Sequence, residues 1–359
     1  MSTISYAQVQ QRIQEQQLNH ERLELQEGAF VVVLERGGRI LGPFLSATGE
    51  SVLWLPDSWA DVAGFAAFLA SGNWNLGGER IWIAPEIQYG VRDRTDFWGT
   101  AQCPSAVDPG AYHLERIDAR RVRLSQQIEL QAHNLATGVK ELQIEREVLP
   151  AANPLHELSD YAELMEGVVY VGYEHILALS EAKTDAILSE GWNLAQLNPG
   201  GQIFIPASPL VTYSDYFAPA DEEHLAIDRA TGLVRVQITG RKQFKVGFKA
   251  AHVFGRLAYA NRLRDGRAYL LIRHFFNNPS RPYAEEPPHL PGCRGHSVHV
   301  YNDGGGFGGF GELEVMAQTI GGESGRSASA DSFLFWLYVG PEDRLDLIAR
   351  HLLGVTFAV

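Results

Sequence analysis

Short runs of apolar residues, separated by Gly, Pro, Asn and Asp, make up most of the chain from residue 23 onward. Runs of this length with turn residues between them are typical of antiparallel β-strands. Two hairpins are indicated by their turns: Gly37 and Gly38 join "AFVVVL" to "RILGPFL", and "ATG" at 136–138 interrupts the long segment 121–149. Glycines in such turns supply the positive φ that a tight hairpin requires. The pattern therefore predicts many strands in large antiparallel sheets.

Helical periodicity is confined to three places. The polar residues 1–22 carry a narrow apolar stripe, which predicts a helical extension. Residues 58–70 are rich in alanine and begin with Ser58, a residue type that caps helices. Residues 341–354 begin with proline, carry acids in the first turn and end in glycine, as expected of a C-terminal helix. Strands and helices do not alternate, so a doubly wound or barrel α/β fold is not expected.

We therefore predict an all-β protein with a few short peripheral helices. No linker rich in Pro or Ser divides the chain, and no internal repeat of fixed period is present. The expected organisation is an N-terminal helical extension over residues 1–22, followed by a single domain over residues 23–359.

The charge balance narrows the choice of ligand. The chain carries a formal net charge of -13, whereas proteins that bind nucleic acid need Lys and Arg to replace counterions. We expect a neutral or weakly charged small molecule as ligand, and no nucleic acid. No run approaches the roughly 20 apolar residues of a membrane span, and Cys103 and Cys293 match no metal spacing and no disulfide framework. These features predict a cytoplasmic protein without membrane contact, and they leave the oligomeric state open.

One glycine-rich segment, "HVYNDGGGFGGFGELEVMAQ" at 299–318, invites a functional interpretation. It contains the spacing G-x-G-x-x-G, which in dinucleotide-binding proteins precedes a helix. Here "ELEVMAQ" follows and alternates like a strand, so we expect no phosphate-binding loop. Asn302 and Asp303 offer two oxygen ligands, whereas calcium takes six to eight. We expect an Asx-type turn at this point, with no metal and no cofactor.

The strand after these glycines carries two acids on one face. Side chains alternate along a strand, so Glu312 and Glu314 share one side, and Leu313 and Val315 share the other. If the aliphatic side enters the core, the acids lie on the opposite face, about 7 Å apart. Such a pair is often a solvated sheet face, but the glycines before it would let a ligand approach the backbone closely.

A second candidate lies in "NLGGERIWIAPE". Strand alternation places Arg80 and Trp82 on one face. A planar guanidinium can hold sugar hydroxyls, and an indole offers a flat apolar surface to a pyranose ring. Glu86 would orient Arg80. The alternative is an ordinary ion pair of Arg80 with Glu79 or Glu86, beside a tryptophan that belongs to the core.

Five segments, taken in order, resemble the galactose mutarotase-like (aldose 1-epimerase-like) superfamily, and in particular an uncharacterised branch of it. They are "GGRILGPFLSATGESVLWLP", "NLGGERIWIAPE", "WNLAQLNPGGQIFIP", "QFKVGFKAAHVFGRLAYAN" and "VYNDGGGFGGFGELE". The resemblance runs from about residue 28 to the C-terminus. It implies a β-supersandwich, built from large twisted antiparallel sheets with a sugar-binding concave face.

The resemblance also implies roles for individual residues. In active epimerases of this superfamily a late glutamate takes the proton of the anomeric hydroxyl, and a mid-chain histidine protonates the ring oxygen, without a cofactor. By motif the glutamate falls on Glu314, and Glu312 beside it would raise one pKa of the pair. The mid-chain region reads "GYEHILALSE", without the other residues of the family motif. His175 is the only histidine there and is therefore the candidate acid, and the alternative is a structural histidine. His274 and His299 compete for that role.

Three kinds of function stay open at this point. The first is an aldose or sugar-phosphate epimerase, with Glu314 as base and with Arg80 and Arg273 as a local basic group. The second is a carbohydrate-binding protein that has the same concave site but no catalysis, and the third is a structural or assembly protein. Two long loops, at 89–110 and 277–295, are expected to form the rim of the site.

Overall fold

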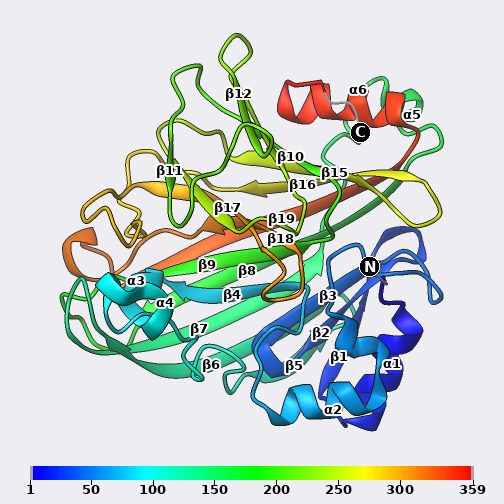
Figure 1. Ribbon diagram of the computed structural model, residues 1–359. Coiled ribbons are helices and arrows are strands. Elements are labelled where there is room, and N and C mark those ends of the chain that lie inside the picture. The colour runs from blue at the N-terminus through cyan, green and yellow to red at the C-terminus, as the bar shows by residue number, and fades with distance from the viewer. Residues whose placement is uncertain (1–2, 357–359) are drawn as a thin grey trace.

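Two large antiparallel sheets lie face to face in the computed structural model, which describes residues 3–356 (Figure 1). The prediction of an all-β protein with large antiparallel sheets and a few short helices is confirmed. Apolar side chains from the inner faces of both sheets meet in one continuous core. This core fixes which side of each strand faces outward, and so decides where polar side chains gather.

The first sheet has nine strands, in the order β1-β2-β3-β4-β9-β18-β17-β14-β11. These are β1 (His20–Glu24), β2 (Phe30–Leu34), β3 (Arg39–Phe44), β4 (Glu79–Ala84), β9 (Glu190–Leu197), β18 (Gly311–Met316), β17 (His296–Asn302), β14 (Phe244–Lys249) and β11 (Tyr213–Asp215).

The second sheet has ten strands, in the order β12-β13-β10-β15-β16-β19-β8-β7-β6-β5. These are β12 (Leu225–Asp228), β13 (Leu233–Gln237), β10 (Gln202–Pro206), β15 (Arg256–Arg262), β16 (Ala268–Phe275), β19 (Ala328–Gly340), β8 (Val169–Glu181), β7 (Gly138–Pro150), β6 (Arg121–Ala132) and β5 (His113–Asp118).

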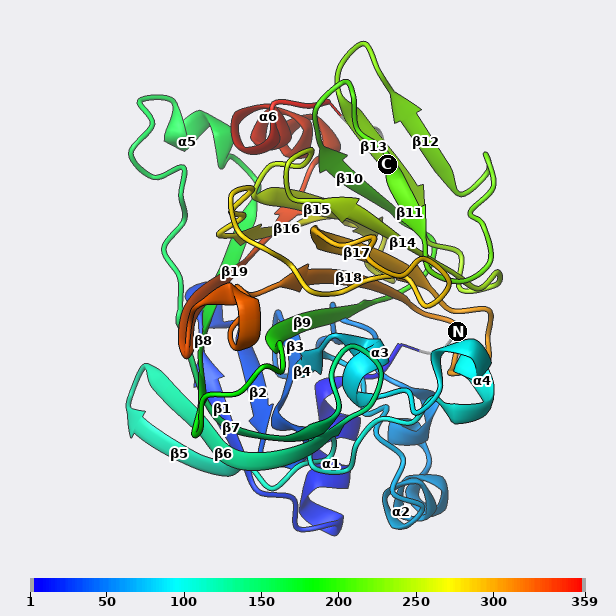
Figure 2. The same cartoon turned by 90° about the vertical axis from the view of Figure 1, so that its left-hand side faces the viewer.

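Among residues 3–356, six α-helices lie outside the sheets, at the two ends of the molecule and along one edge (Figure 1, Figure 2). They are α1 (Tyr6–Glu15), α2 (Val62–Ala70), α3 (Glu86–Tyr89), α4 (Phe97–Thr100), α5 (Tyr161–Leu164) and α6 (Glu342–Leu353). The apolar side of α6 packs on the outer face of the ten-stranded sheet, where Ile348 joins a cluster with Leu270 and Trp336. Helices α1 and α2 close the outer face of the nine-stranded sheet over β2 and β3.

Both hairpins predicted from turn residues are present. Strands β2 and β3 pair from Leu34 opposite Arg39, and Gly37 and Gly38 between them have φ of 70° and 53°. Strands β6 and β7 pair along their length and close at Gly138, whose φ is 143°. In each case glycine permits a backbone conformation that a residue with a Cβ adopts only with strain.

The start of α2 differs from the prediction. Residues Asp57–Ala60 form a separate 3₁₀ turn, and the helix begins after Asp61, whose side chain accepts a hydrogen bond from the N–H of Ala63 at 3.1 Å. Ser58 is therefore not the cap. The turn buries Trp59 and lets its Nε1 donate to the carbonyl of Leu76 at 2.9 Å, which a helix continuous through this point would not do.

The C-terminal helix and the N-terminal extension were predicted to end at residues 354 and 22. Helix α6 stops at Gly354, which has φ of 69°, as expected of a glycine after a helix. The predicted boundary after residue 22 falls inside β1, because His20 already pairs with Leu34 of β2.

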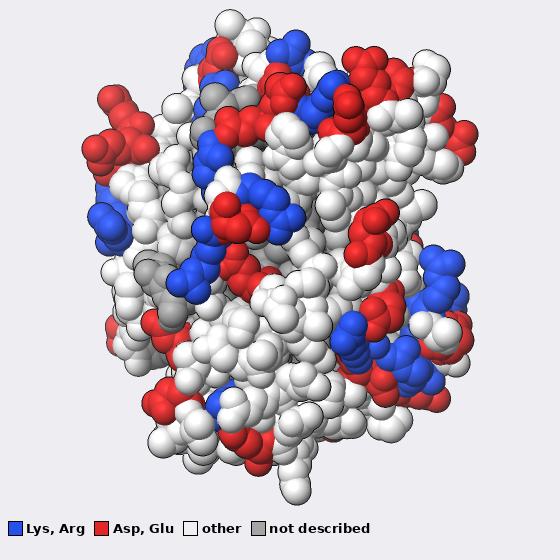
Figure 3. Space-filling view, turned by 90° about the vertical axis from the view of Figure 1, so that its right-hand side faces the viewer, with Lys and Arg blue, Asp and Glu red and all other residues white. Residues whose placement is uncertain are grey.

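Acidic and basic side chains are interspersed on the face shown in Figure 3. None of the helices in the described part of the chain has the length and apolar character of a membrane span.

Truncation of a buried side chain on α6 tests whether this helix is part of the cooperative fold. Ile348→Ala removes atoms from a fully buried side chain and should lower the free energy of unfolding by about 2–5 kcal/mol. Leu347→Ala, one residue earlier on the partly exposed side, should cost much less. Urea unfolding followed by circular dichroism measures both, and equal losses would mean that α6 is not docked as described.

Candidate functional site

The outer face of the nine-stranded sheet carries the polar side chains at its centre. On β18, Leu313 points into the core, which leaves Glu312 and Glu314 on the outer face. On β4, alternation brings Arg80 and Trp82 to the same face. Both strands have the phase that the sequence pattern predicted. Because β4 and β18 are both paired with β9, residues more than two hundred positions apart meet over the middle of the sheet.

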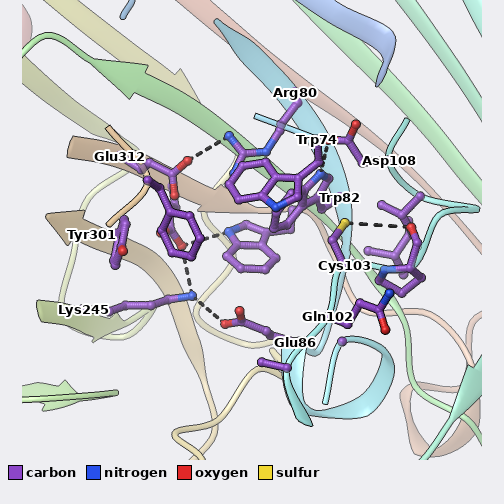
Figure 4. A pocket seen from close by; sticks show the side chains of 18 of the residues that line it. Trp74, Arg80, Trp82, Glu86, Gln102, Cys103, Asp108, Lys245, Tyr301 and Glu312 are labelled. Carbon is purple, nitrogen blue, oxygen red and sulfur yellow. Dashed lines mark hydrogen bonds and ion pairs between the residues drawn. The ribbon is translucent and has the colours of Figure 1, made fainter. Parts of the chain in front are cut away.

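A cavity of about 490 Å³ opens on this face (Figure 4). Its volume lies within the usual range of small-molecule sites. Aromatic side chains form much of the wall, and charged side chains form the floor. The aromatic lining comprises Trp74, Trp82, Phe97, Trp98, Trp192, Phe217, Tyr301, Phe307 and Phe310, and the charged lining comprises Arg80, Glu86, Asp108, Lys245, Glu312 and Glu314.

Glu314 is a deeply buried carboxylate of the floor, with 1% of its side chain exposed. Its Oε2 accepts a hydrogen bond from Trp192 Nε1 at 2.9 Å and lies 3.4 Å from Lys245 Nζ. Burial raises the pKa of Glu314 to about 7; Lys245 opposes this rise, and the negative charges of Glu312 and Glu86 add to it. A carboxyl with this pKa can take up or release a proton near neutral pH.

Lys245 joins two of the acids. Its ammonium lies 3.1 Å from Glu86 Oε2 (Figure 4). It also lies 3.4 Å from Glu314 Oε2 and 4.1 Å from the centre of the Trp192 ring. Burial alone would lower the pKa of Lys245, but the carboxylates of Glu314 and Glu86 outweigh it and raise the pKa above its ordinary value. The side chain therefore stays cationic within the buried floor.

Arg80 and Glu312 form the second ion pair of the floor. Arg80 Nη1 lies 2.8 Å from Glu312 Oε1, and the guanidinium carbon stands 4.2 Å from the centre of the Trp82 ring (Figure 4). Neither atom of the pair has an aligned hydrogen-bond partner in the protein, and Arg80 Nε has none either. The pair thus keeps buried N–H and oxygen groups whose hydrogen-bonding capacity the protein itself does not use.

The glycine-rich segment is a turn organised by one aspartate. Asp303 Oδ2 accepts hydrogen bonds from the backbone N–H groups of Gly305, Phe307 and Gly309, at 3.0, 3.0 and 2.8 Å. This is the Asx-type turn expected from the sequence, extended to three donors. Gly308, with φ of 123°, packs against the Trp54 ring so closely that a Cβ would stand 2.7 Å from it. The turn presents Phe307 to the cavity and does not form an anion-binding loop.

The two long loops meet at the rim. Arg94 in the first loop lies 2.8 Å from Glu286 and donates to the carbonyl groups of Pro287 and Pro288 in the second. Glu190 on β9 holds the second loop by accepting the N–H groups of residues 284 and 285, each at 3.0 Å. The first loop contributes Phe97, Trp98 and Asp108 to the cavity lining, whereas none of the described lining residues comes from the second loop, which contacts the first at Arg94.

Five predicted residues come together in the cavity, and four do not. Arg80, Trp82, Glu86, Glu312 and Glu314 all line it. His299 is buried beside the floor without lining the cavity, and its Nε2 lies 2.9 Å from the hydroxyl of Tyr216.

The remaining three predicted residues lie away from the cavity. His175 and Arg273 point between the two sheets, where both contact Glu79. His274 is on the outer face of the ten-stranded sheet, stacked on Trp336 with ring centres 5.2 Å apart. Within the described residues, no histidine lines the cavity.

Sequence reasoning missed Lys245, Trp192 and Tyr301. The sequence did contain a signal for Lys245. In "QFKVGFKA" it lies between Phe244 and Val246 in an apolar strand, and a lysine at such a position needs a partner. The tryptophan and the tyrosine lie in the strand segments "EGWNLAQL" and "HSVHVYN", where nothing local separates a cavity wall from a core. Their role depends on strand pairing across the sheet.

Comparison with known structures defines the class of the fold. A candidate aldose 1-epimerase from Escherichia coli K12 is similar with a TM-score of 0.51 and 12% identity, over 89% of this chain and 99% of that chain. A galactose mutarotase-like protein from Lactobacillus casei ATCC 334 has a TM-score of 0.44 and 11% identity, over 90% and 99% of the two chains. The fold is that of the galactose mutarotase-like proteins, as the sequence resemblance implied.

The chain belongs to a family of unknown function, DUF6786, whose sequence model matches residues 9–359. No curated protein matches the sequence.

A titration of tryptophan fluorescence tests the state of Glu314. Because the pKa of Glu314 is raised to about 7, its carboxyl is neutral below this pH and charged above it, directly beside the indole N–H of Trp192. We expect an emission change with a midpoint near pH 7 that is absent in both Glu314→Gln and Trp192→Phe.

Glu190→Gln is the matched control, because Glu190 also has a pKa raised to about 7 by burial but does not bond Trp192. The transition should persist in this variant. A midpoint near 4.5, the ordinary value for glutamate, would contradict the described environment of Glu314.

Proposed function

We propose that this protein is a carbohydrate-active protein that binds an aldose in the cavity and interconverts its anomers, with Glu314 as the base. The observation that carries the proposal is a carboxyl with a pKa near 7 on the floor of a cavity walled by tryptophans. The fold adds support, since a carbohydrate-related fold surrounds this site.

The lining suits a sugar in two ways. The rings of Trp82 and Trp192 offer apolar surfaces for the C–H faces of a pyranose, and they meet edge to face with centres 5.7 Å apart. Arg80 and Lys245 supply N–H donors, and Glu312 supplies acceptors, for the hydroxyls around the ring. Buried polar groups of this kind bind hydroxyls selectively because each one gains a partner.

The charge of the floor favours a neutral sugar over a phosphorylated one. Two cations, Arg80 and Lys245, face three glutamates, Glu86, Glu312 and Glu314. A phosphate group placed among them would meet repulsion from the carboxylates that are ionised. We therefore propose aldoses as the substrate class, with sugar phosphates as the less favoured alternative.

The proposed reaction needs two proton transfers. Ionised Glu314 takes the proton of the anomeric hydroxyl while the ring oxygen receives a proton, and the bond between C1 and the ring oxygen breaks. The aldehyde carbon turns about its bond to C2, and the same transfers run backward to close the other anomer. His175 lies between the sheets and not in the cavity. We therefore assign the protonation of the ring oxygen to Lys245, the cationic donor next to Glu314.

A second candidate function is sugar binding without catalysis. It is favoured by the lack of a histidine among the described residues that line the cavity, since the resemblance implied a histidine as the acid. Lys245 has a raised pKa and gives up its proton less readily than an imidazolium does. In this case the same lining would hold the sugar, and Lys245 would serve only as a hydrogen-bond donor.

Exchange spectroscopy by NMR decides between the two candidates. Wild-type protein should accelerate the exchange between α and β anomers of at least one sugar in a panel of glucose, galactose, mannose, xylose and glucose 6-phosphate. Glu314→Gln should lower the rate by about 100-fold or more, because a general base contributes about 10²–10⁴. The rate in wild type should rise with pH through about 7, as Glu314 ionises.

Glu157→Gln, a change of the same kind at an exposed position, should leave the rate unchanged. Line broadening of the sugar without accelerated exchange would support the binding function. If no sugar of the panel is bound, the proposal is wrong.

Lys245 is tested by a pair of substitutions. Lys245→Met removes the ammonium and should weaken sugar binding and abolish exchange. Lys245→Arg keeps a positive charge but has almost no acidic character, so it should retain binding and lose exchange. Full exchange activity in the arginine variant would show that the proton of the ring oxygen comes from another group.

A further inference from the structure

A second polar cluster lies between the two sheets, on the side of β4 opposite to the cavity. Glu79 accepts hydrogen bonds from Arg273 Nη1 at 2.9 Å and from Asn193 Nδ2 at 2.7 Å. Its Oε1 lies 2.7 Å from His175 Nδ1. All four side chains are fully buried. The proposed function gives none of them a role, so the cluster needs its own explanation.

Arg146 on β7 ends this cluster and has no negative partner. Its Nε donates to His175 Nε2 at 2.9 Å, so the imidazole carries its own proton on Nδ1, toward Glu79. The side chain of Arg146 is fully buried, and neither Nη1 nor Nη2 has a hydrogen-bond partner in the protein. Over residues 3–356, no carboxylate forms an ion pair with Arg146.

The cluster therefore holds one positive charge in excess. Arg146 and Arg273 are cations, and Glu79 supplies one negative charge, already engaged by Arg273. His175 is neutral, because burial and the charge of Arg146 lower its pKa to about 4. A guanidinium does not lose its proton in a protein. An uncompensated buried cation is strongly destabilising, so a counter-charge would stabilise this cluster.

Two more donors without partners belong to segments that neighbour Arg146. The hydroxyl of Tyr112 and Nε2 of Gln126 are both buried and unbonded. The Tyr112 ring centre lies 5.2 Å from Arg146 Cζ, and Gln126 is on β6, the strand paired with β7. The backbone of Gly38 packs against the same place: a Cβ there would stand 2.2 Å from Arg146 Nη1 and 2.9 Å from Tyr112 Cε2.

We propose that a small monovalent anion of the halide class binds between the sheets at Arg146, with Tyr112 and Gln126 as additional donors. The guanidinium Nη atoms, the hydroxyl and the amide all offer protons. A water molecule among them would have few acceptors for its own two protons, whereas a halide accepts from every side. A halide also cancels the excess charge, which water does not. The site is separate from the sugar cavity and does not depend on the proposed function.

Crystals grown in sodium bromide provide the direct test. Bromide replaces chloride in such sites and gives an anomalous signal. We expect an anomalous peak within hydrogen-bonding distance of Arg146 Nη1 or Nη2, and no peak there in Arg146→Met. Density that refines as water alone, with no anomalous signal between the sheets, would overturn the proposal.

Unfolding in solution provides a second test that does not require crystals of the variant. The bromide concentration is varied, and the larger anion methanesulfonate makes up the rest of a constant ionic strength. The unfolding equilibrium constant is measured in urea at each bromide concentration. In wild type this constant should fall tenfold for each tenfold rise in bromide above the dissociation constant. The dependence should vanish in Arg146→Met and weaken in Tyr112→Phe, which removes only a hydroxyl.

Arg12→Met is the matched control, because Arg12 is also buried but is paired with Glu15. It should keep the full bromide dependence of wild type. The same dependence in Arg146→Met as in wild type, or none in wild type, would contradict a halide site at Arg146.

Discussion

The cavity depends on the pairing of buried carboxylates with two cations on the outer face of the nine-stranded sheet. Glu314 and Glu86 share Lys245, and Glu312 faces Arg80. Charges removed from water are tolerated only when such partners are present. Burial raises the pKa of Glu314 to about 7 while Lys245 limits the rise, and a pKa near neutral pH is what a base needs.

Strand β4 connects this cavity with the interior of the molecule. Because side chains alternate along a strand, Glu79 points between the sheets while Arg80, the next residue, points into the cavity. Each of the two residues forms an ion pair: Glu79 with Arg273 between the sheets, and Arg80 with Glu312 in the cavity. Arg80 in the cavity and Glu79 in the polar cluster are therefore consecutive residues of one strand. The cluster itself does not line the cavity.

Much of this architecture could be predicted from the sequence, because alternation with a period of two is a local property. The phases of "GELEV" and "ERIWI" correctly placed Glu314 and Arg80 on the outward side. Local pattern gave no clear side of β8 for His175, since Glu174 precedes it, Ile176 follows it, and the strand is covered on both faces for part of its length. Arg273 and His274 are adjacent on β16 and so lie on opposite faces, with Arg273 between the sheets and His274 stacked on Trp336 outside them.

The sequence pattern does not predict which strands pair when they are distant in the chain. Lys245 reaches Glu314 only because β14, β17 and β18 lie in that order in the sheet, which no local signal gives. The choice of Asp61 over Ser58 as a helix cap likewise followed from the burial of Trp59, a tertiary contact. The excess charge at Arg146 became apparent only when every partner between the sheets was known.

The measurement that tests the central claim most directly is a crystal structure of the protein soaked with the aldose that binds best. The account predicts a sugar in the cavity, with its anomeric oxygen about 2.6–3.2 Å from the carboxylate of Glu314 and a ring face against Trp82 or Trp192. A sugar bound elsewhere on the molecule, or one that lies in the cavity with its anomeric carbon directed away from Glu314, would contradict it.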